Sequence, residues 1–195
     1  MNLWEQDACE LWDAALAEYP RTLEVHGGER LLALDRWYHD DLPTAVRERQ
    51  PAHLTHDELV QLVRWKMGRG MWRPNNLQLA ESNADEDVVA ATGDGLAAVP
   101  DLLGPVRAIA RLRGVGAATA SAVLAAIYPE HYPFLEDVIA AQIPTLGPPA
   151  FTPRYYVGYA SAIRDRAAAL ATACPHQQWT PHAVDLALWA QSTGA

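Results

Sequence analysis

The sequence is short of lysine and cysteine, and each shortage narrows the chemistry that the chain can support. Only one of the fifteen basic residues is a lysine, Lys66, so any reaction that needs a side-chain amine has a single candidate. Cysteine occurs only at Cys9 and Cys174, whose wide separation fits neither a metal cluster nor a small disulfide scaffold. We therefore predict two buried thiols in a protein of the reducing cytoplasm.

Long apolar runs and metal-ligand clusters are also missing. No stretch of about 18 apolar residues occurs, so we expect no membrane span. His53 and His56, with acidic neighbours, come nearest to a metal-ligand group. Isolated histidine pairs are common on protein surfaces, and we predict no metal site.

Alternation of apolar and polar residues, which is typical of a half-buried strand, does not occur. Apolar residues recur instead at spacings of three and four along most of the chain, which predicts helices. Thr55 and Glu58 form a capping box that opens one helix, and Thr152 and Thr180, each followed by proline, open two more. The predicted fold class is all-α with about nine helices. Residues 1–195 suffice for a single helical domain or for two small lobes.

Three other local patterns give further expectations. Leu3–Leu16 has the spacing of one amphipathic helix. Pro74, followed by two asparagines, predicts a break in the chain, and Gly93–Gly95 predicts a turn.

Acidic side chains outnumber basic ones, and the formal net charge of −9 argues against general nucleic-acid binding. Most of the imbalance lies in residues 1–60, which hold five basic and thirteen acidic side chains. Residues 61–120 hold seven basic and six acidic side chains. A polyanion is therefore expected to meet the middle third of the chain.

The most basic stretch is Arg64-Trp-Lys-Met-Gly-Arg-Gly-Met-Trp-Arg, which has four cations and no acid. Cations interleaved with aromatic rings are typical of nucleic-acid contacts, because arginine meets phosphate and indole stacks on bases. We predict DNA contacts from Lys66, Arg69, Trp72 and Arg73. The alternative is that these cations only complement the C-terminal end of a helix.

A second candidate interface is the glycine turn in Leu112-Arg-Gly-Val-Gly-Ala-Ala-Thr, between predicted helices at 106–112 and 117–127. The two glycines permit positive φ and close approach of a partner to the backbone. Unpaired amides at the start of the second helix form an anion site, for which a DNA phosphate is the expected ligand. The predicted DNA contacts of this turn are Arg111, Arg113, Gly114, Val115, Gly116, Ala117, Ala118 and Thr119.

With Ala120 and Val123, residues 107–127 resemble the helix-hairpin-helix motif, and the continuation resembles the helix-hairpin-helix glycosylase superfamily of base-excision DNA repair. The match covers about 35 residues. It implies a bilobal all-α fold in which the hairpin holds the DNA backbone and a later aspartate faces the target sugar. Asp137, 25 residues after Leu112, matches that aspartate. The resemblance also implies a monovalent cation held by the hairpin carbonyls, and no other cofactor.

Two differences from the superfamily show which of its branches the chain does not resemble. Ala118 stands where the lyase branch of the superfamily carries its lysine, and alanine cannot form an imine. The four cysteines of the iron–sulfur branch are also missing. The chain therefore resembles the monofunctional glycosylases without a cluster.

The predicted function is hydrolysis of the N-glycosidic bond of a damaged base flipped out of duplex DNA. The protein is expected to be a monomer in the cytoplasm, or at the nucleoid if it is bacterial. Asp137 is the predicted catalytic carboxylate, and Glu136 is its rival because a shift of one residue exchanges them. A simple helix cap is another interpretation of Asp137. The competing functions are a non-catalytic helix-hairpin-helix binder of DNA structures and a protein-interaction module, which the net charge favours.

Overall fold

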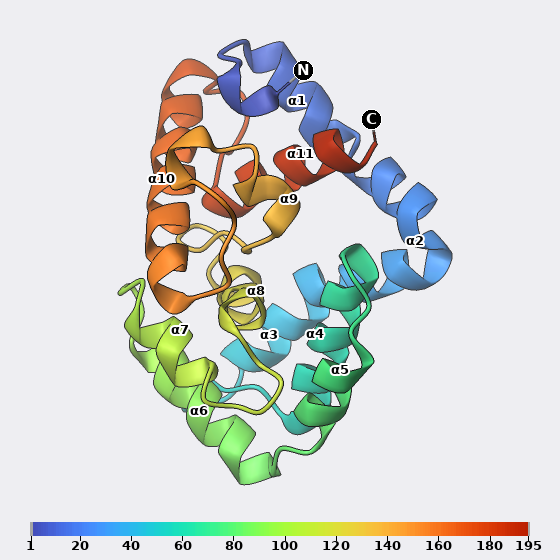
Figure 1. The fold of residues 1–195 in the computed structure, drawn as a ribbon, viewed down its shortest axis with the longest axis vertical. Coiled ribbons are helices and arrows are strands. Elements are labelled where there is room, and N and C mark those ends of the chain that lie inside the picture. The colour runs from blue at the N-terminus through green and yellow to red at the C-terminus, as the bar shows by residue number, and fades with distance from the viewer. Residues whose placement is uncertain (1, 195) are drawn as a thin grey trace.

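The computed structural model describes residues 2–194, and all regular structure within them is helical, which confirms the all-α class (Figure 1). The α-helices are α1 (Cys9–Ala17), α2 (Tyr19–Arg36), α3 (Leu42–Arg47), α4 (His56–Arg69), α5 (Pro74–Glu81), α6 (Asp85–Ala97), α7 (Gly104–Ile109), α8 (Ala117–Ile127), α9 (Asp137–Ala140), α10 (Pro153–Ala173) and α11 (Pro181–Thr193). Two short 3₁₀ helices, η1 (Leu3–Glu5) and η3 (Pro144–Leu146), and one π-helical segment, η2 (Trp37–Asp41), complete the set.

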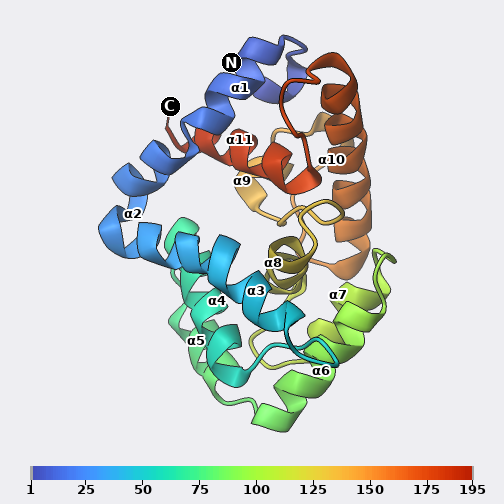
Figure 2. The same ribbon diagram turned by 180° about the vertical axis from the view of Figure 1, so that it is seen from behind.

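The two ends of the chain lie in the same part of the molecule. In Figures 1 and 2, α1 lies beside α10 and α11 at one end, and helices α3 to α7 make up the other. Helix α2 is kinked at Gly28, where φ is 65°; it runs from the first group to the second and packs on both α11 and α4. Side chains that meet between the two groups therefore come from segments far apart in the sequence.

Helix α8 lies between the two groups and forms the centre of the core. All of its residues are buried, and it contacts α3, α4, α7 and α10. Its alanine-rich sequence explains this position, because small side chains let several helices approach one axis. Within residues 2–194, no helix combines the length and the hydropathy that crossing a membrane requires.

Local capping signals in the sequence are confirmed. The Thr55 amide donates to Glu58 Oε2 at 2.9 Å, and the Glu58 amide donates back to Thr55 Oγ1 at 3.3 Å. Thr152 and Thr180 cap α10 and α11 through their hydroxyl oxygens.

Three local predictions are wrong. Pro74 opens α5 instead of breaking the chain, because the first position of a helix needs no amide hydrogen. Gly93–Gly95 lies inside α6; a side chain at Gly95 would collide with Ile109 of α7, so this glycine serves helix packing. Leu3–Leu16 is divided into η1 and α1 by extended residues.

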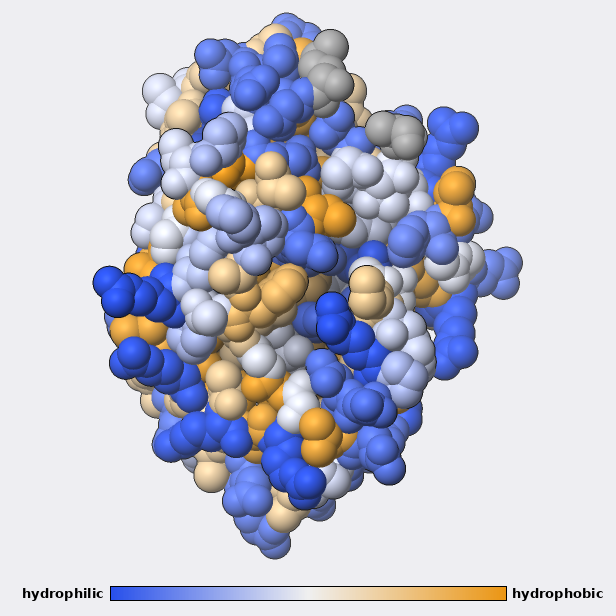
Figure 3. Space-filling model, viewed as in Figure 1, coloured by the Kyte–Doolittle hydropathy of each residue, from blue (hydrophilic) through white to orange (hydrophobic). Residues whose placement is uncertain are grey.

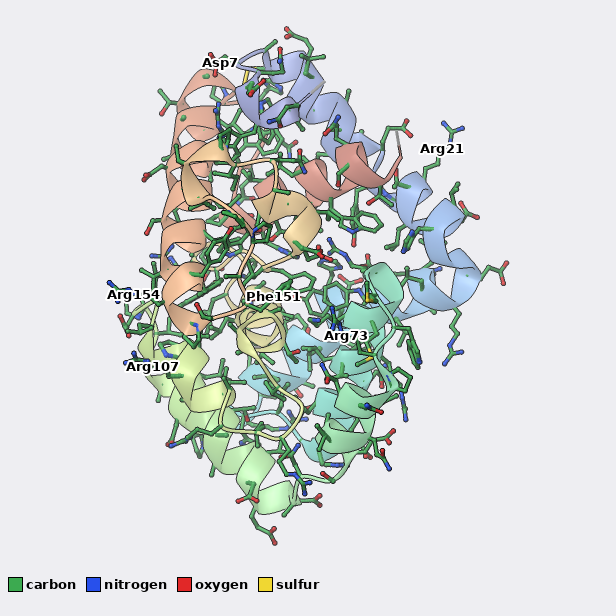
Figure 4. The ribbon with its side chains drawn as sticks, in the orientation of Figure 1. Asp7, Arg21, Arg73, Arg107, Phe151 and Arg154 are labelled. Carbon is green, nitrogen blue, oxygen red and sulfur yellow. A yellow bond between two sulfur atoms is a disulfide. The ribbon has the colours of Figure 1, made fainter. Side chains whose placement is uncertain are left out.

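The prediction of two free thiols is also wrong. Cys9, at the start of α1, and Cys174, directly after α10, form a disulfide with Cα atoms 5.7 Å apart (Figure 4). Trp12 packs edge-on against Trp179 next to this link, with ring centroids 5.9 Å apart. The fold brings these distant residues together, and cysteine usage no longer argues for a reducing compartment.

Candidate nucleic-acid interface

The adjacent acids Glu136 and Asp137 point in opposite directions. Glu136 has extended backbone angles and ends the strand-like approach to α9, so consecutive side chains lie on opposite sides. Glu136 is buried and forms an ion pair with Arg69, whereas Asp137 is exposed. The Asp137 Oδ1 atom accepts a hydrogen bond from the neighbouring Val138 amide at 3.0 Å. Asp137, and not Glu136, is therefore the acid that a ligand can reach.

Arg69 does not lie on the surface, which contradicts its prediction as a DNA contact. Its side chain is fully buried, and Nη2 lies 2.6 Å from Glu136 Oε2. The guanidinium carbon lies within 4.7–5.4 Å of four ring centroids, an aromatic box made by Tyr19, Trp65, Phe134 and Trp189. Such contacts stabilise a desolvated cation.

Burial shifts the pKa values of the Glu136 carboxyl and the Arg69 guanidinium. Desolvation raises the pKa of Glu136 to about 7, against the opposing attraction of Arg69. Desolvation also opposes the charge of Arg69, but Glu136 and the neighbouring acidic groups outweigh it and raise the pKa of the guanidinium. Arg69 therefore stays charged, and Glu136 is the member of the pair that titrates.

A buried carboxylate, Asp35, extends the polar network behind the aromatic box. Its Oδ1 accepts hydrogen bonds from the Tyr19 hydroxyl at 2.6 Å and from Trp65 Nε1 at 2.8 Å. Burial alone would raise the pKa of Asp35, but hydrogen bonds from His39, Tyr19 and Trp65 outweigh it and lower the pKa. Asp35 thus remains a buried anion that orders the surrounding rings.

His39 and His182 join this network to α11. Their Nε2 atoms lie 3.0 Å apart. His39 Nδ1 lies 2.9 Å from the Asp35 carbonyl oxygen, and His182 Nδ1 lies 2.8 Å from Asp185 Oδ2. Both Nδ1 atoms thus face oxygen acceptors, which places the two imidazoles in one chain of polar contacts from Asp35 to Asp185.

A small pocket opens in front of the buried ion pair. Its wall includes Glu136, Asp137, Lys66, Arg73 and Phe151. Figure 4 shows Arg73 and Phe151 on the same face of the molecule, where Figure 3 shows a hollow beside hydrophobic surface. The structure thus brings four of the predicted site residues together: Lys66 of α4, Arg73 of the loop after it, and Glu136 and Asp137 at the start of α9.

Lys66 has an unusual environment in this pocket. Desolvation lowers its pKa, while Glu136 and Asp137 act in the opposite direction. Within residues 2–194 its amine forms no hydrogen bond or close ion pair. Lys66 is thus a half-buried cation available to a ligand that enters beside Asp137.

The loop after α4 carries exposed apolar and basic side chains. Met71 is 68% exposed and Trp72 is 52% exposed, and Arg73 is also exposed. Trp72 does not line the Asp137 pocket but a separate cavity beside α2. The basic-aromatic segment is therefore divided between the buried residues Trp65, Met67 and Arg69 and surface residues that line two separate hollows.

Helices α7 and α8 lie on either side of the predicted glycine turn, and the two glycines of this turn have different roles. Gly114 has φ = 74°, and a side chain there would collide with the Asn76 carbonyl oxygen and the Ala80 amide of α5. This glycine is needed for packing within the protein. Gly116 is exposed and faces open space, with extended backbone angles. Only Gly116 leaves the backbone accessible to a ligand.

The start of α8 has unpaired main-chain amides, which is the feature on which the predicted phosphate site depends. Among residues 2–194, the amides of Ala117, Ala118 and Thr119 have no hydrogen-bond partner. Their side chains are buried, as is that of Val115, so only main-chain atoms of this turn are available to DNA.

The two arginines of the turn line a polar groove that also contains Asp87 and Asp94. Arg111 Nη2 pairs with Asp94 at 2.6 Å, which reduces the positive charge offered there. The main chain of Arg113 is held by Asn83, and its guanidinium is exposed.

Sequence reasoning missed several residues of this region. His39 follows Asp35 by four positions and His182 precedes Asp185 by three, which are spacings that place side chains on one helix face. Those pairs were detectable in the sequence. Phe151, by contrast, lies in a loop without a distinguishing pattern.

Comparisons of the chain with protein-family models, curated proteins and solved structures find no match.

Proposed function

We propose that this protein binds damaged DNA and hydrolyses the N-glycosidic bond of a flipped base, with Asp137 facing the target sugar. The observation that carries the proposal is the exposed Asp137 carboxylate in one pocket with Lys66 and Arg73. A carboxylate stabilises positive charge that develops on the sugar, and neighbouring cations meet the flanking phosphates.

The reaction needs no group beyond those of the chain and a water molecule. As the C1′–N bond breaks, the base leaves with the bonding electrons and the sugar acquires oxocarbenium character. Asp137 stabilises this charge and accepts a proton from the water whose oxygen bonds to C1′. Glu136, fixed against Arg69 on the other side of the backbone, positions the segment and does not meet the sugar.

The hairpin supports the same proposal. Gly116 and the unpaired amides that begin α8 offer a phosphate an approach to the main chain. The monovalent cation implied by the resemblance belongs to this proposal as well, at the carbonyls of the same turn.

One observation favours the alternative of a non-catalytic binder of DNA structures. The Asp137 pocket has a volume of about 50 Å³, well below the roughly 300–1,000 Å³ of ordinary ligand sites. Arg69 and its aromatic box occupy the space behind it. Catalysis therefore requires the pocket to widen when a base enters, whereas binding of the backbone does not.

Replacement of Asp137 by asparagine separates the two functions. Under single-turnover conditions with duplexes carrying defined base lesions, Asp137→Asn should lower the rate of base release about 100-fold or more, with DNA affinity unchanged or higher. The matched control is Asp165→Asn, an exposed acid on α10. Base release by Asp137→Asn at the wild-type rate would exclude Asp137. DNA binding without base release by the wild-type protein on every lesion would favour the non-catalytic binder.

A further inference from the structure

A second cavity lies between α2 and α4, away from Asp137. Leu31 and Leu34 of α2 form its apolar floor, and the exposed indole of Trp72 closes one side. Its volume is about 140 Å³, nearly three times that of the Asp137 pocket. An exposed tryptophan beside an apolar cavity is suited to a flat aromatic ligand.

Two glycines keep this cavity open. Gly27 and Gly68 belong to its wall, and a Cβ atom at Gly68 would approach Leu31 Cδ1 to 2.8 Å. At Gly27 an added Cβ would lie 2.6 Å from Leu31 Cβ. A side chain at Gly68 would displace Leu31 or separate α2 from α4, and a side chain at Gly27 would displace Leu31 within α2.

The rim of the cavity is positively charged although the whole chain is acidic. Arg30 and Arg64 line both this cavity and an adjoining hollow that contains Gln61. Arg30 is exposed and has no ion-pair or hydrogen-bond partner within residues 2–194. Arg64 pairs with Glu81 at 2.9 Å, but 44% of its side chain remains exposed. The cavity therefore suits a ligand with a flat apolar ring and an adjacent negative charge.

We propose that this cavity binds an unpaired nucleobase, with Trp72 stacked on the base and Arg30 and Arg64 on the neighbouring phosphates. This inference rests on the proposed nucleic-acid binding and adds a second contact, to a single-stranded segment. The base enters the cavity, and its sugar–phosphate backbone follows the adjoining hollow between the two arginines. Aromatic stacking combined with cations along the backbone is the usual means of binding single strands.

An acidic peptide is the rival ligand, since it also combines negative charge with apolar side chains. The size of the cavity favours the base. A volume of about 140 Å³ corresponds to roughly five waters at their share of liquid volume, which is enough for one ring system and too little for a helix.

The test measures fluorescence anisotropy of a labelled single-stranded oligothymidine and of the same oligomer carrying abasic residues throughout. The wild-type protein should bind the oligomer with bases at least about fivefold more tightly. Trp72→Ala should remove that difference, and Trp72→Phe should retain most of it. Arg30→Glu should weaken both oligomers and reduce the salt dependence of binding. Arg154→Glu, an exposed arginine of α10, is the matched control and should leave binding unchanged.

Equal wild-type affinity for the two oligomers, or a Trp72→Ala variant that binds like wild type, would overturn the inference. Tighter binding of a glutamate-rich peptide, lost in Trp72→Ala, would assign the cavity to a peptide instead. If the inference about this cavity fails in one of these ways, binding of the wild-type protein to a duplex with an abasic-site analogue would still support the proposed function. Failure to bind any of these nucleic acids at low salt would reject both.

Discussion

Arg69 Nη2 and Glu136 Oε2 form a buried ion pair 2.6 Å long, and this pair links the end of α4 to the segment that presents Asp137. This link explains why Glu136 is buried while the adjacent Asp137 is exposed. Glu136 points inward to the Arg69 guanidinium in the aromatic box, and Asp137 is consequently turned outward at the start of α9. The position of the proposed catalytic acid thus depends on a residue that does not touch the ligand.

The first prediction concerns the stability that this pair provides. Arg69→Met leaves Glu136 buried without its partner and should lower the free energy of unfolding by about 3–5 kcal/mol. The double variant Arg69→Met/Glu136→Leu removes both charges and should recover most of that loss. Urea denaturation of the three proteins measures the effect. A single variant as stable as wild type would show that the pair contributes nothing.

The second prediction concerns pH. Burial raises the pKa of Glu136 from 4.5 to about 7, so between these values the folded protein keeps a proton that the unfolded chain has released. Stability contributed by this group should therefore fall as pH rises from about 4.5 to 7. Denaturation midpoints across this range test the sign, and Glu136→Gln should flatten the profile. The prediction would be contradicted if wild-type stability rose with pH over this range and the rise were absent in Glu136→Gln.

The third prediction concerns the disulfide, which closes a loop of sequence separation 165. Reduction, or the double variant Cys9→Ser/Cys174→Ser, should lower the free energy of unfolding by about 2–5 kcal/mol, because a long loop is released in the unfolded chain. Thermal denaturation with and without reductant measures the difference. Reductant should not change the thermal stability of the double variant, which has no disulfide to reduce. If reductant also left the stability of the wild-type protein unchanged, the disulfide would contribute nothing to stability.

The fourth prediction compares the two glycines of the hairpin. Gly114→Ala introduces a side chain at positive φ and against the α5 backbone, and should cost about 1–3 kcal/mol of stability. Gly116→Ala points into open space, so its stability should change by less than about 0.5 kcal/mol. If the turn binds a phosphate, Gly116→Ala should weaken DNA binding without unfolding. If Gly114→Ala and Gly116→Ala destabilised the protein equally, the two glycines would not have the separate roles described above.

The elements that the sequence predicts correctly are those specified by neighbouring residues. The capping box at Thr55 and Glu58 and the start of α8 at Ala117 depend on contacts within one turn. The role of Gly95 has no local signal, because it depends on Ile109 of another helix. Local patterns thus predict where helices begin better than they predict which faces meet.

The candidate site was predictable in part for the same reason. The resemblance to the glycosylase superfamily implies Asp137, and in the structure this residue shares a pocket with Lys66 and Arg73. Arg69 looked like a surface cation at a helix end, because the four rings that enclose it come from α2, α4, α11 and the segment before α9. The pairing of Cys9 with Cys174 likewise has no local signal.

The central claim, recognition of damaged DNA, is tested most directly by one comparison of affinities. The ligands are a duplex with a stable abasic-site analogue and the same duplex undamaged, each measured at two salt concentrations. The account predicts tighter binding to the abasic duplex and weaker binding to both as salt rises. No binding to either duplex at low salt would contradict the account and leave the hairpin as an element of the fold alone.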